Sequence, residues 1–348
     1  MACNSFYSRD PFIIATAMIR FLPGLLLVLL LTSVDSRAQN KLISHLKISD
    51  TAPEKLLSTR SLVLFENTYT TEELGNIQKA FQQIGIDADF YLDFTKVVAG
   101  IDTERAYSAY FTTREITFLI FLTKSSEGYN FYATEYNNTM QFVTPGQFAW
   151  KVSNRRLDEL MTTIYRDSWL REKKQNFLIN DIPETDIVVP IITGRRSELF
   201  PIDLRIDKMA VPRLDDDALQ AEVDTLFKKL YPYPEKYQVV KMPPDEKDLV
   251  KQGFQYVLLY LYVDGKSARE ILGYDMTRNV ATAYGSVSYP NGAPQVKTIS
   301  VDQPVYKFYI KHIRSGNVFL GTKWDADESL VQALKNHIMG FRNEFKLN

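Results

Sequence analysis

Two clusters of carboxylates in this 348-residue sequence are of the residue type that performs acid–base chemistry. One cluster is the run Asp215 to Asp217, and a second comprises Asp325, Asp327 and Glu328. Glycoside hydrolysis requires two carboxyl groups that converge on one bond, where one donates a proton and the other acts as base or nucleophile. Each cluster also precedes a segment with helical spacing, where carboxylates satisfy free backbone amides. We therefore favour helix capping and keep catalysis as the alternative.

The sequence gives weaker evidence for a catalytic nucleophile, a metal site or a nucleotide-binding loop. The three histidines, His45, His312 and His337, lack a partner at a metal-ligand spacing. No Gly-x-Ser-x-Gly motif marks a nucleophilic serine, although a Ser–His–Asp site assembles from distant positions. The triplet Gly265-Lys266-Ser267 lacks the preceding glycine of a phosphate-binding loop, because Tyr260 occupies that position. We predict no cofactor and no metal.

Aromatic residues suggest binding instead of a reaction. They make up 13% of the chain, and exposed aromatic rings bind sugars and protein partners well. Packing of the same rings between helix ends and a sheet is the favoured alternative. The candidate ligand-binding residues, which lie near prolines, are Tyr231, Tyr233, Tyr237, Tyr284 and Tyr289.

The apolar pattern predicts an α/β unit in the first half of the chain. A capping box of Thr70 and Glu73 begins its first helix, and Gly85 ends that helix. The other predicted elements are a strand at 61–65, a strand at 89–93, a helix at 102–110, a buried strand at 116–122, its hairpin partner at 129–136, and a closing helix capped by Ser153.

The second half shows a similar order of elements. Asp264-Gly265 is predicted to turn a hairpin, and Asp325 with Glu328 to cap the last helix. The other predicted elements are strands at 208–211 and 237–241, a helix capped by residues 215–217, a short helix from 243 that stops at Gly253, a buried strand at 255–263, its return strand at 270–276, and strands at 280–287, 305–313 and 318–324.

The matching order predicts an α/β fold with two similar domains in tandem, each with a mixed sheet and the order strand, helix, strand, helix, hairpin, helix. Trp150 and Trp324 each precede a closing helix. Coincidence among common α/β elements is the alternative to duplication. The predicted boundaries are an N-terminal segment at 39–60, a first domain at 61–182, a connection at 183–214 and a second domain at 215–348.

The first residues of the chain predict export. Residues 21–31 form an apolar run of signal-peptide length, which Arg20 precedes and Ser36-Arg37-Ala38 follows. We expect a signal peptide at 1–38 that is cleaved after Ala38, with Met18 as an alternative start. A retained membrane anchor over 12–31 is the alternative.

Cleavage removes Cys3, the only cysteine, so the exported chain forms no disulfide. Lys and Arg number 41 against 42 Asp and Glu. This balance lacks the basic excess that nucleic-acid binding requires. We therefore predict a non-catalytic periplasmic or secreted protein, without a stable membrane span, that binds an envelope protein or a cell-surface glycan. An exported hydrolase that acts on glycan or ester bonds is the alternative.

One stretch of the second half has a local resemblance to known proteins. Residues 251–258 (KQGFQYVL) give a helix end, a glycine and a buried strand, and residues 271–280 (ILGYDMTRNV) give two strands around a polar turn. This pattern resembles the α/β domain of CsgG-type curli-secretion proteins and of the N-terminal domain of TolB. The resemblance implies an envelope-side, non-enzymatic module. It transfers no functional residue, since the chain lacks the lipidation cysteine of the former and the propeller repeats of the latter.

Overall fold

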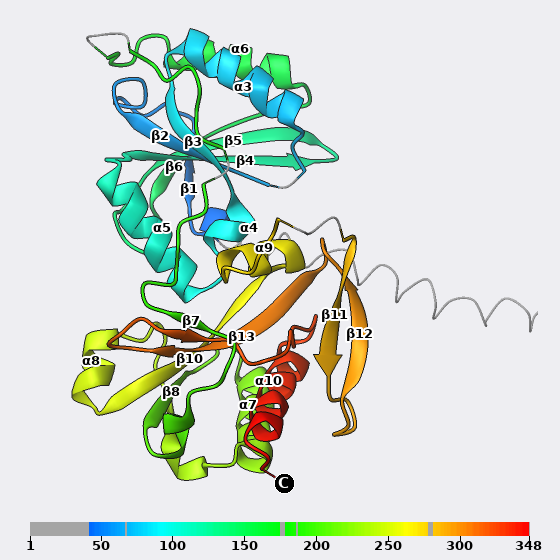
Figure 1. Ribbon diagram of the computed structural model, residues 1–348. Helices are drawn as coiled ribbons and strands as arrows, with labels where there is room; N and C mark the ends of the chain where they lie inside the picture. Colours follow the sequence, from blue (N-terminus) through cyan, green and yellow to red (C-terminus); the bar gives the residue numbers. More distant parts are fainter. Residues whose placement is uncertain (1–41, 67, 175–177, 186, 278–280, 348) are drawn as a thin grey trace, which may run out of the picture.

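The structure is a computed structural model that describes residues 42–66, 68–174, 178–185, 187–277 and 281–347. The predicted signal peptide lies outside these residues. Two six-stranded sheets, each covered by helices, are stacked one above the other (Figure 1). In the part of the chain that is described, no helix combines the length and the apolar character needed to cross a membrane.

The first sheet has the strand order β1-β6-β5-β4-β2-β3. Strand β2 is parallel to β3 and β4, β4 to β6 form an antiparallel meander, and β1 is parallel to β6. The strands are β1 (Lys47–Ser49), β2 (Arg60–Phe65), β3 (Asp87–Asp93), β4 (Phe118–Ser125), β5 (Gly128–Glu135) and β6 (Phe148–Asn154).

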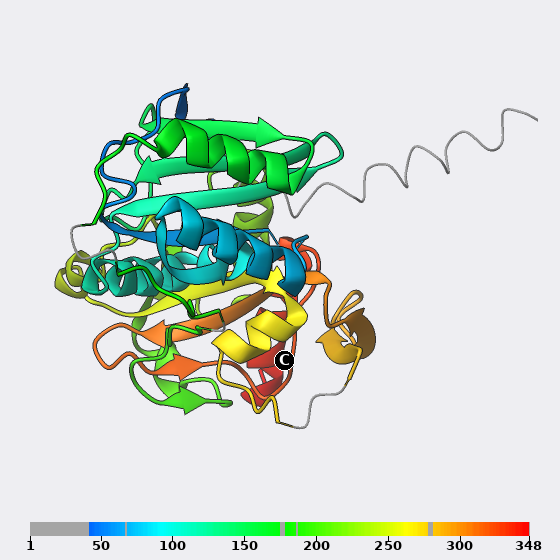
Figure 2. The same ribbon diagram turned by 90° about the horizontal axis from the view of Figure 1, so that it is seen from above.

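Helices cover both faces of the first sheet (Figure 1, Figure 2). Helices α3 (Thr71–Ile84) and α6 (Leu157–Ser168) lie on one face, and α4 (Phe94–Val97) and α5 (Ile101–Thr113) lie on the other. The capping box of Thr70 and Glu73 is present as predicted, and Gly85 ends α3 at φ +101°. The outer core packs Phe81 against Phe131, and Phe131 against Trp150.

The second sheet has the order β7-β14-β13-β10-β8-β9, and its strand directions follow the pattern of the first sheet. The predicted α/β class with mixed sheets is confirmed, and descent from a duplication stays a prediction. The elements are β7 (Arg196–Ser197), β8 (Lys208–Pro212), α7 (Asp217–Leu230), β9 (Tyr237–Val240), α8 (Glu246–Lys251), β10 (Phe254–Asp264), α9 (Gly265–Ile271), β13 (Pro304–His312), β14 (Val318–Phe319) and α10 (Leu330–Glu344), with 3₁₀ turns at Ile202–Arg205 and Pro234–Lys236.

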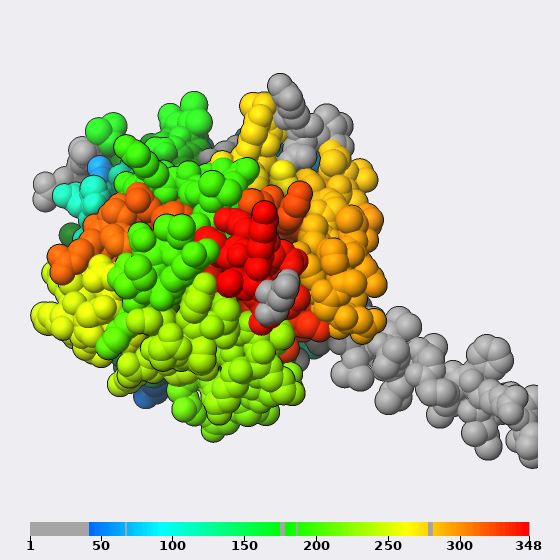
Figure 3. Space-filling model, turned by 60° about the horizontal axis from the view of Figure 1, so that its bottom comes forward, coloured from blue at the N-terminus to red at the C-terminus, as the bar shows by residue number. Residues whose placement is uncertain are grey.

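A hairpin is inserted in the second half between α9 and β13. It consists of β11 (Ala283–Ser288) and β12 (Gln295–Ser300), which pair only with each other among the described strands. It lies beside α10 on the outer face of the molecule (Figure 3). The strand predicted at 280–287 therefore belongs to this hairpin and not to the main sheet.

Four local predictions are wrong. Asp264 does not turn a hairpin, because its side chain accepts a hydrogen bond from the Ser267 amide and begins α9. The antiparallel partner of β10 is consequently β13, and residues 270–276 form no return strand. Ser153 lies in β6, and α6 begins only after Arg156. The last helix is capped by Ser329.

Two predicted boundaries also change. The N-terminal segment at 39–60 contributes β1 to the first sheet and buries Leu56 and Leu57 in its core. The connection at 183–214 supplies β7 and β8 to the second sheet. The strand predicted at 208–211 is β8, whereas β1 and β7 are only three and two residues long and carry too little pattern to be recognised from the sequence.

A buried group of charges joins the two halves. Asp102 of α5 is 3% exposed, and its carboxylate contacts Lys311 Nζ (3.2 Å), Tyr309 Oη (3.2 Å) and Arg105 Nη1 (2.7 Å). Glu246 of α8 lies 2.7 Å from Arg105 Nη1 and 2.9 Å from Lys311 Nζ. Two carboxylates are thus neutralised by two cations across the interface.

Candidate functional site

The candidate site lies where the chain reverses direction in the second sheet. From β8 the chain passes through α7 to β9 on one side, and from β9 it returns through α8 to β10 on the other side of β8. In open α/β sheets, ligands bind at such a switch point, outside the carboxyl ends of the strands. The ends of β8 and β10 therefore mark the expected position.

These two strands separate at their carboxyl ends. Their pairing ends at Ala210 and Val257, although β10 continues to Asp264. The turn between α4 and α5 covers the exposed edge of β10, because the Tyr262 amide donates a 2.6 Å hydrogen bond to the Ala99 carbonyl. Gly100 lies so close that an added Cβ would be 2.5 Å from the Tyr260 carbonyl oxygen.

A cavity of about 270 Å³ occupies this position. It exceeds the ~150 Å³ that holds benzene in an apolar protein interior, and it approaches the ~300 Å³ of small drug-sized sites. Both halves of the chain supply its wall. The lining residues are Val98, Ala99, Gly100, Ile101 and Glu104 from the first half, and Val211, Pro212, Leu214, Val223, Phe227, Met242, Leu258, Leu259, Tyr260, Tyr262, Tyr306, Phe308, Leu330 and Leu334 from the second.

Four residues give the cavity its polar character: Glu104 and three tyrosines. The rings of Tyr262 and Tyr306 are stacked with centroids 4.3 Å apart, and those of Tyr260 and Tyr306 are 5.8 Å apart. Burial, together with nearby Tyr306 and Glu104, raises the pKa of Tyr260 to about 12. The Tyr260 phenol is therefore neutral at physiological pH and carries a proton to donate.

The start of α7 is closed to anions. Asp216 accepts hydrogen bonds from the amides of Ala218 and Leu219, as the capping interpretation predicts. A phosphate at a switch point commonly occupies such amides. Here a carboxylate already occupies them, so the arrangement disfavours nucleotides.

In the second acidic cluster, Asp325 is buried and paired inside the protein. Asp325 is 4% exposed, and its carboxylate contacts Lys307 Nζ at 2.5 Å and His337 Nδ1 at 2.9 Å. Burial acts to raise the pKa of Asp325, but Lys307 and His337 hold it below its ordinary value. Burial lowers the pKa of His337, which remains neutral.

This Asp–His pair lacks the geometry of a catalytic triad. The His337 Nε2 atom, which would face a nucleophile, is buried and has no hydrogen-bond partner among the described residues. The ring packs against Phe200 and Phe308, with centroids 4.9 Å and 6.3 Å away. The contacts place the pair in the core and not in a cleft.

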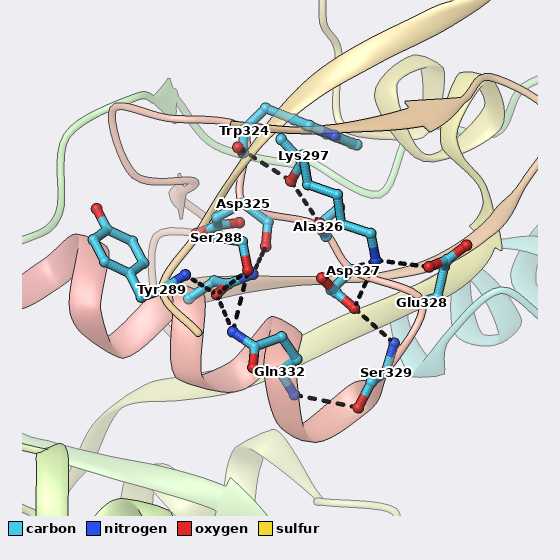
Figure 4. A network of polar contacts seen from close by, with 12 residues as sticks. Ser288, Tyr289, Lys297, Trp324, Asp325, Ala326, Asp327, Glu328, Ser329 and Gln332 are labelled. Carbon is cyan, nitrogen blue, oxygen red and sulfur yellow. Dashed lines mark hydrogen bonds and ion pairs between the residues drawn. The ribbon is translucent and has the colours of Figure 1, made fainter. Parts of the chain in front are cut away.

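The rest of the second cluster anchors the inserted hairpin (Figure 4). Lys297 of β12 contacts Glu328 at 2.6 Å and Asp327 at 3.4 Å. Asp327 in turn accepts a hydrogen bond from the Ser329 amide at the start of α10. The Gln332 side chain donates to Ser288 of β11 at 3.2 Å. These carboxylates and amides hold β11, β12 and α10 together.

None of the five tyrosines singled out in the sequence lines the cavity. Tyr231, Tyr284 and Tyr289 are buried, which contradicts an exposed platform. Tyr233 and Tyr237 are half-buried and pack on Phe341 and Phe227 respectively. Their prolines mark helix ends and turns, so the alternative of core packing describes them better.

The sequence reasoning missed the tyrosines that do line the cavity. Tyr260 and Tyr262 lie two residues apart in the buried strand β10, and Tyr306 lies on its neighbour β13. Polar hydroxyls on alternate positions of an otherwise apolar strand were the available signal. Within the described ranges, no three histidine, cysteine or acidic residues are grouped as a metal site.

Comparison with known proteins finds no matching family and no matching curated protein for this sequence. The functional argument therefore rests on the geometry of the cavity.

Proposed function

We propose that this chain is a non-catalytic binding protein that holds a small, largely apolar ligand in the cavity at the switch point of its second sheet. The observation that carries the proposal is the apolar cavity whose wall comes from both halves of the chain. Ligand sites are typically concave, mostly apolar and placed at domain interfaces or switch points.

The charges near the cavity favour binding over hydrolysis. Among the described lining residues, Glu104 is the only carboxylate, whereas glycoside hydrolysis needs two. The neighbouring Asp102 and Glu246 share Arg105 and Lys311 as ion-pair partners. A glycan ligand has less support than an apolar one, because the cavity is apolar and three of the five candidate platform tyrosines are buried.

The proposed location is the periplasm or the exterior of the cell. Its support is the apolar run at 21–31 and the small residues up to Ala38. Fractionation of cells that make the native chain, followed by N-terminal sequencing, tests it. We expect a mature chain that begins at Gln39 and is absent from the cytosolic fraction. An uncleaved cytosolic chain would contradict export without affecting the cavity.

Binding is tested with N-phenyl-1-naphthylamine, a neutral dye whose fluorescence rises in apolar surroundings. We expect saturable binding to the wild type and its loss in Val223→Phe, because Val223 lines the cavity and phenylalanine fills it. Val296→Phe is the matched control, since Val296 is 75% exposed on β12. Met242→Trp at the half-buried part of the wall is a second blocking variant. Equal binding by all four proteins would overturn the proposal.

A further inference from the structure

We propose that the ligand of this cavity is an uncharged molecule whose apolar body carries a hydrogen-bond acceptor, such as a ketone or ester carbonyl, and that this oxygen accepts a hydrogen bond from the Tyr260 hydroxyl. This inference rests on the proposed binding function and specifies its ligand class. Its basis is a polar group in the cavity wall that has no partner in the described part of the chain.

Tyr260 is one of the residues of β10 that line the cavity. Successive residues of a strand point to opposite faces of a sheet, so its side chain shares a face with Leu258 and with Phe308 of β13, which belong to the core beneath α7 and α10. Val223 of α7 and Leu330 of α10 line the cavity from the other side. The Tyr260 side chain therefore lies in the space between the sheet and these helices, where the cavity is.

The Tyr260 hydroxyl makes no hydrogen bond with any described residue. The ring packs against those of Tyr306 and Phe308, with centroids 5.8 Å and 5.4 Å away. Burial is the main cause of the raised pKa of Tyr260, about 12, so the phenol keeps its proton at neutral pH. A donor that has lost water without gaining a protein partner is costly. An acceptor on the ligand would remove this cost.

A second tyrosine shows the contrasting case. The Tyr231 hydroxyl also lacks a partner among the described residues, but it is completely enclosed by protein and does not line the cavity. A ligand cannot reach it, so it is a cost of core packing alone. The Tyr260 hydroxyl is not enclosed in this way, and its side chain borders the cavity. It is therefore placed to meet a ligand.

The other lining residues indicate an uncharged acceptor. None of the described residues in the wall is lysine, arginine or histidine. A carboxylate ligand would thus lose its hydration without meeting a cationic side chain. An ammonium group only donates hydrogen bonds and would leave the Tyr260 proton unpaired. A carbonyl oxygen needs only the bond from Tyr260, while Val223, Phe227 and Leu330 surround the hydrocarbon.

Displacement of the dye by acetophenone and by α-methylstyrene tests the inference, because these compounds share one shape and differ in a carbonyl oxygen against a methylene group. We expect Tyr260→Phe, which removes only the hydroxyl, to weaken acetophenone about three- to tenfold and to leave α-methylstyrene unchanged. Tyr165→Phe, on α6 and 40% exposed, is the matched control and should behave as the wild type towards both compounds. Benzoate should require at least about a tenfold higher concentration than acetophenone.

The infrared carbonyl stretch of acetophenone bound to the wild type is a second measurement, which needs no variant. A hydrogen bond from the phenol should lower this frequency below its value in hexane. An unshifted band, equal effects of Tyr260→Phe on the two compounds, or benzoate binding as tight as that of acetophenone would overturn the inference. In each of these cases the apolar site stands if the dye binds. If the dye does not bind to the wild type, the proposed function itself fails.

Discussion

The amide of Tyr262 donates a 2.6 Å hydrogen bond to the carbonyl oxygen of Ala99. This bond joins the edge of β10 to the turn between α4 and α5, and so connects the two halves of the chain through their backbones. Ala99 also belongs to the apolar core on that face of the second sheet. The interface between the two halves is therefore formed by backbone hydrogen bonding and by a shared apolar core. The shape of the cavity depends on how the halves meet there.

Gly100→Ala is expected to destabilise the protein by about 1–3 kcal/mol, the usual cost of overpacking. The added Cβ would lie 2.5 Å from the Tyr260 carbonyl oxygen, a backbone atom that cannot rotate away. Urea unfolding of the two proteins measures the difference. Gly75→Ala is the control, since no atom lies within 4 Å of its added Cβ, and a helical glycine gains about 0.5–1 kcal/mol on this change. Equal stability of Gly100→Ala and the wild type would show that the halves can move apart.

Asp102→Ala should reduce the free energy of unfolding by about 3–5 kcal/mol, because it leaves Lys311 buried beside Tyr309 with one carboxylate fewer. Asp158→Ala removes an aspartate that pairs with Arg156 at the surface, where both side chains are about two-thirds exposed. That control should lose far less stability, because solvent screens an exposed ion pair. Chemical denaturation gives both values, and similar losses would mean that the buried cluster contributes no more than a surface pair.

Lys307→Met should lower stability by about 3–5 kcal/mol, since it leaves the Asp325 carboxylate buried beside neutral His337. Adding Asp325→Leu removes the uncompensated charge, so the double variant should lose less than the sum of the single losses. A double-mutant cycle by urea unfolding measures this coupling. If the double variant lost the full sum of the two single losses, Lys307 and Asp325 would not stabilise each other in the folded protein.

Glu73 should make the stability of the folded protein depend on pH in the acidic range. Partial burial acts to raise its pKa, but hydrogen bonds from Lys124, the Thr70 amide and Tyr129 lower it to about 2 from the ordinary 4.5. A carboxylate with a lowered pKa in the folded state stabilises the protein above pH 4.5, and this stabilisation is lost as the pH falls towards 2.

The advantage of the wild type over Glu73→Gln should accordingly be constant above pH 4.5 and shrink below it. Thermal unfolding across this pH range supplies the comparison. Glu72→Gln in the same helical turn is the control and should give a curve parallel to that of the wild type. A gap between wild type and Glu73→Gln that does not vary with pH would contradict the lowered pKa.

Local signals predicted much of the fold. The Thr70–Glu73 box and the Asp216 cap were predictable because capping depends on residues a few positions apart. The hairpin turn predicted at Asp264-Gly265 was wrong for the same reason, since an aspartate before a glycine suits both a hairpin turn and a helix start. The β10–β13 pairing decided between them, and it joins residues on either side of the inserted hairpin.

The cavity was beyond the reach of such signals. Its wall combines Val98–Glu104 with residues from five elements of the second half, and no local pattern specifies that these segments meet. Tyr260 and Tyr262 were recognised only as part of an apolar strand. Their role depends on β8 ending before β10 does, which is a property of the assembled sheet.

The edge of β10 that faces β8 also bears on how the chain assembles. Beyond Val257 this edge is apolar and has no neighbouring strand of its own sheet among the described residues, and such edges recruit strands from other molecules. Residues 98–100, which cover it, are synthesised well before β10, and N-terminal units fold first during synthesis. We therefore expect the first half to be in place when this aggregation-prone strand emerges and to shield it. A second half produced without the first should precipitate.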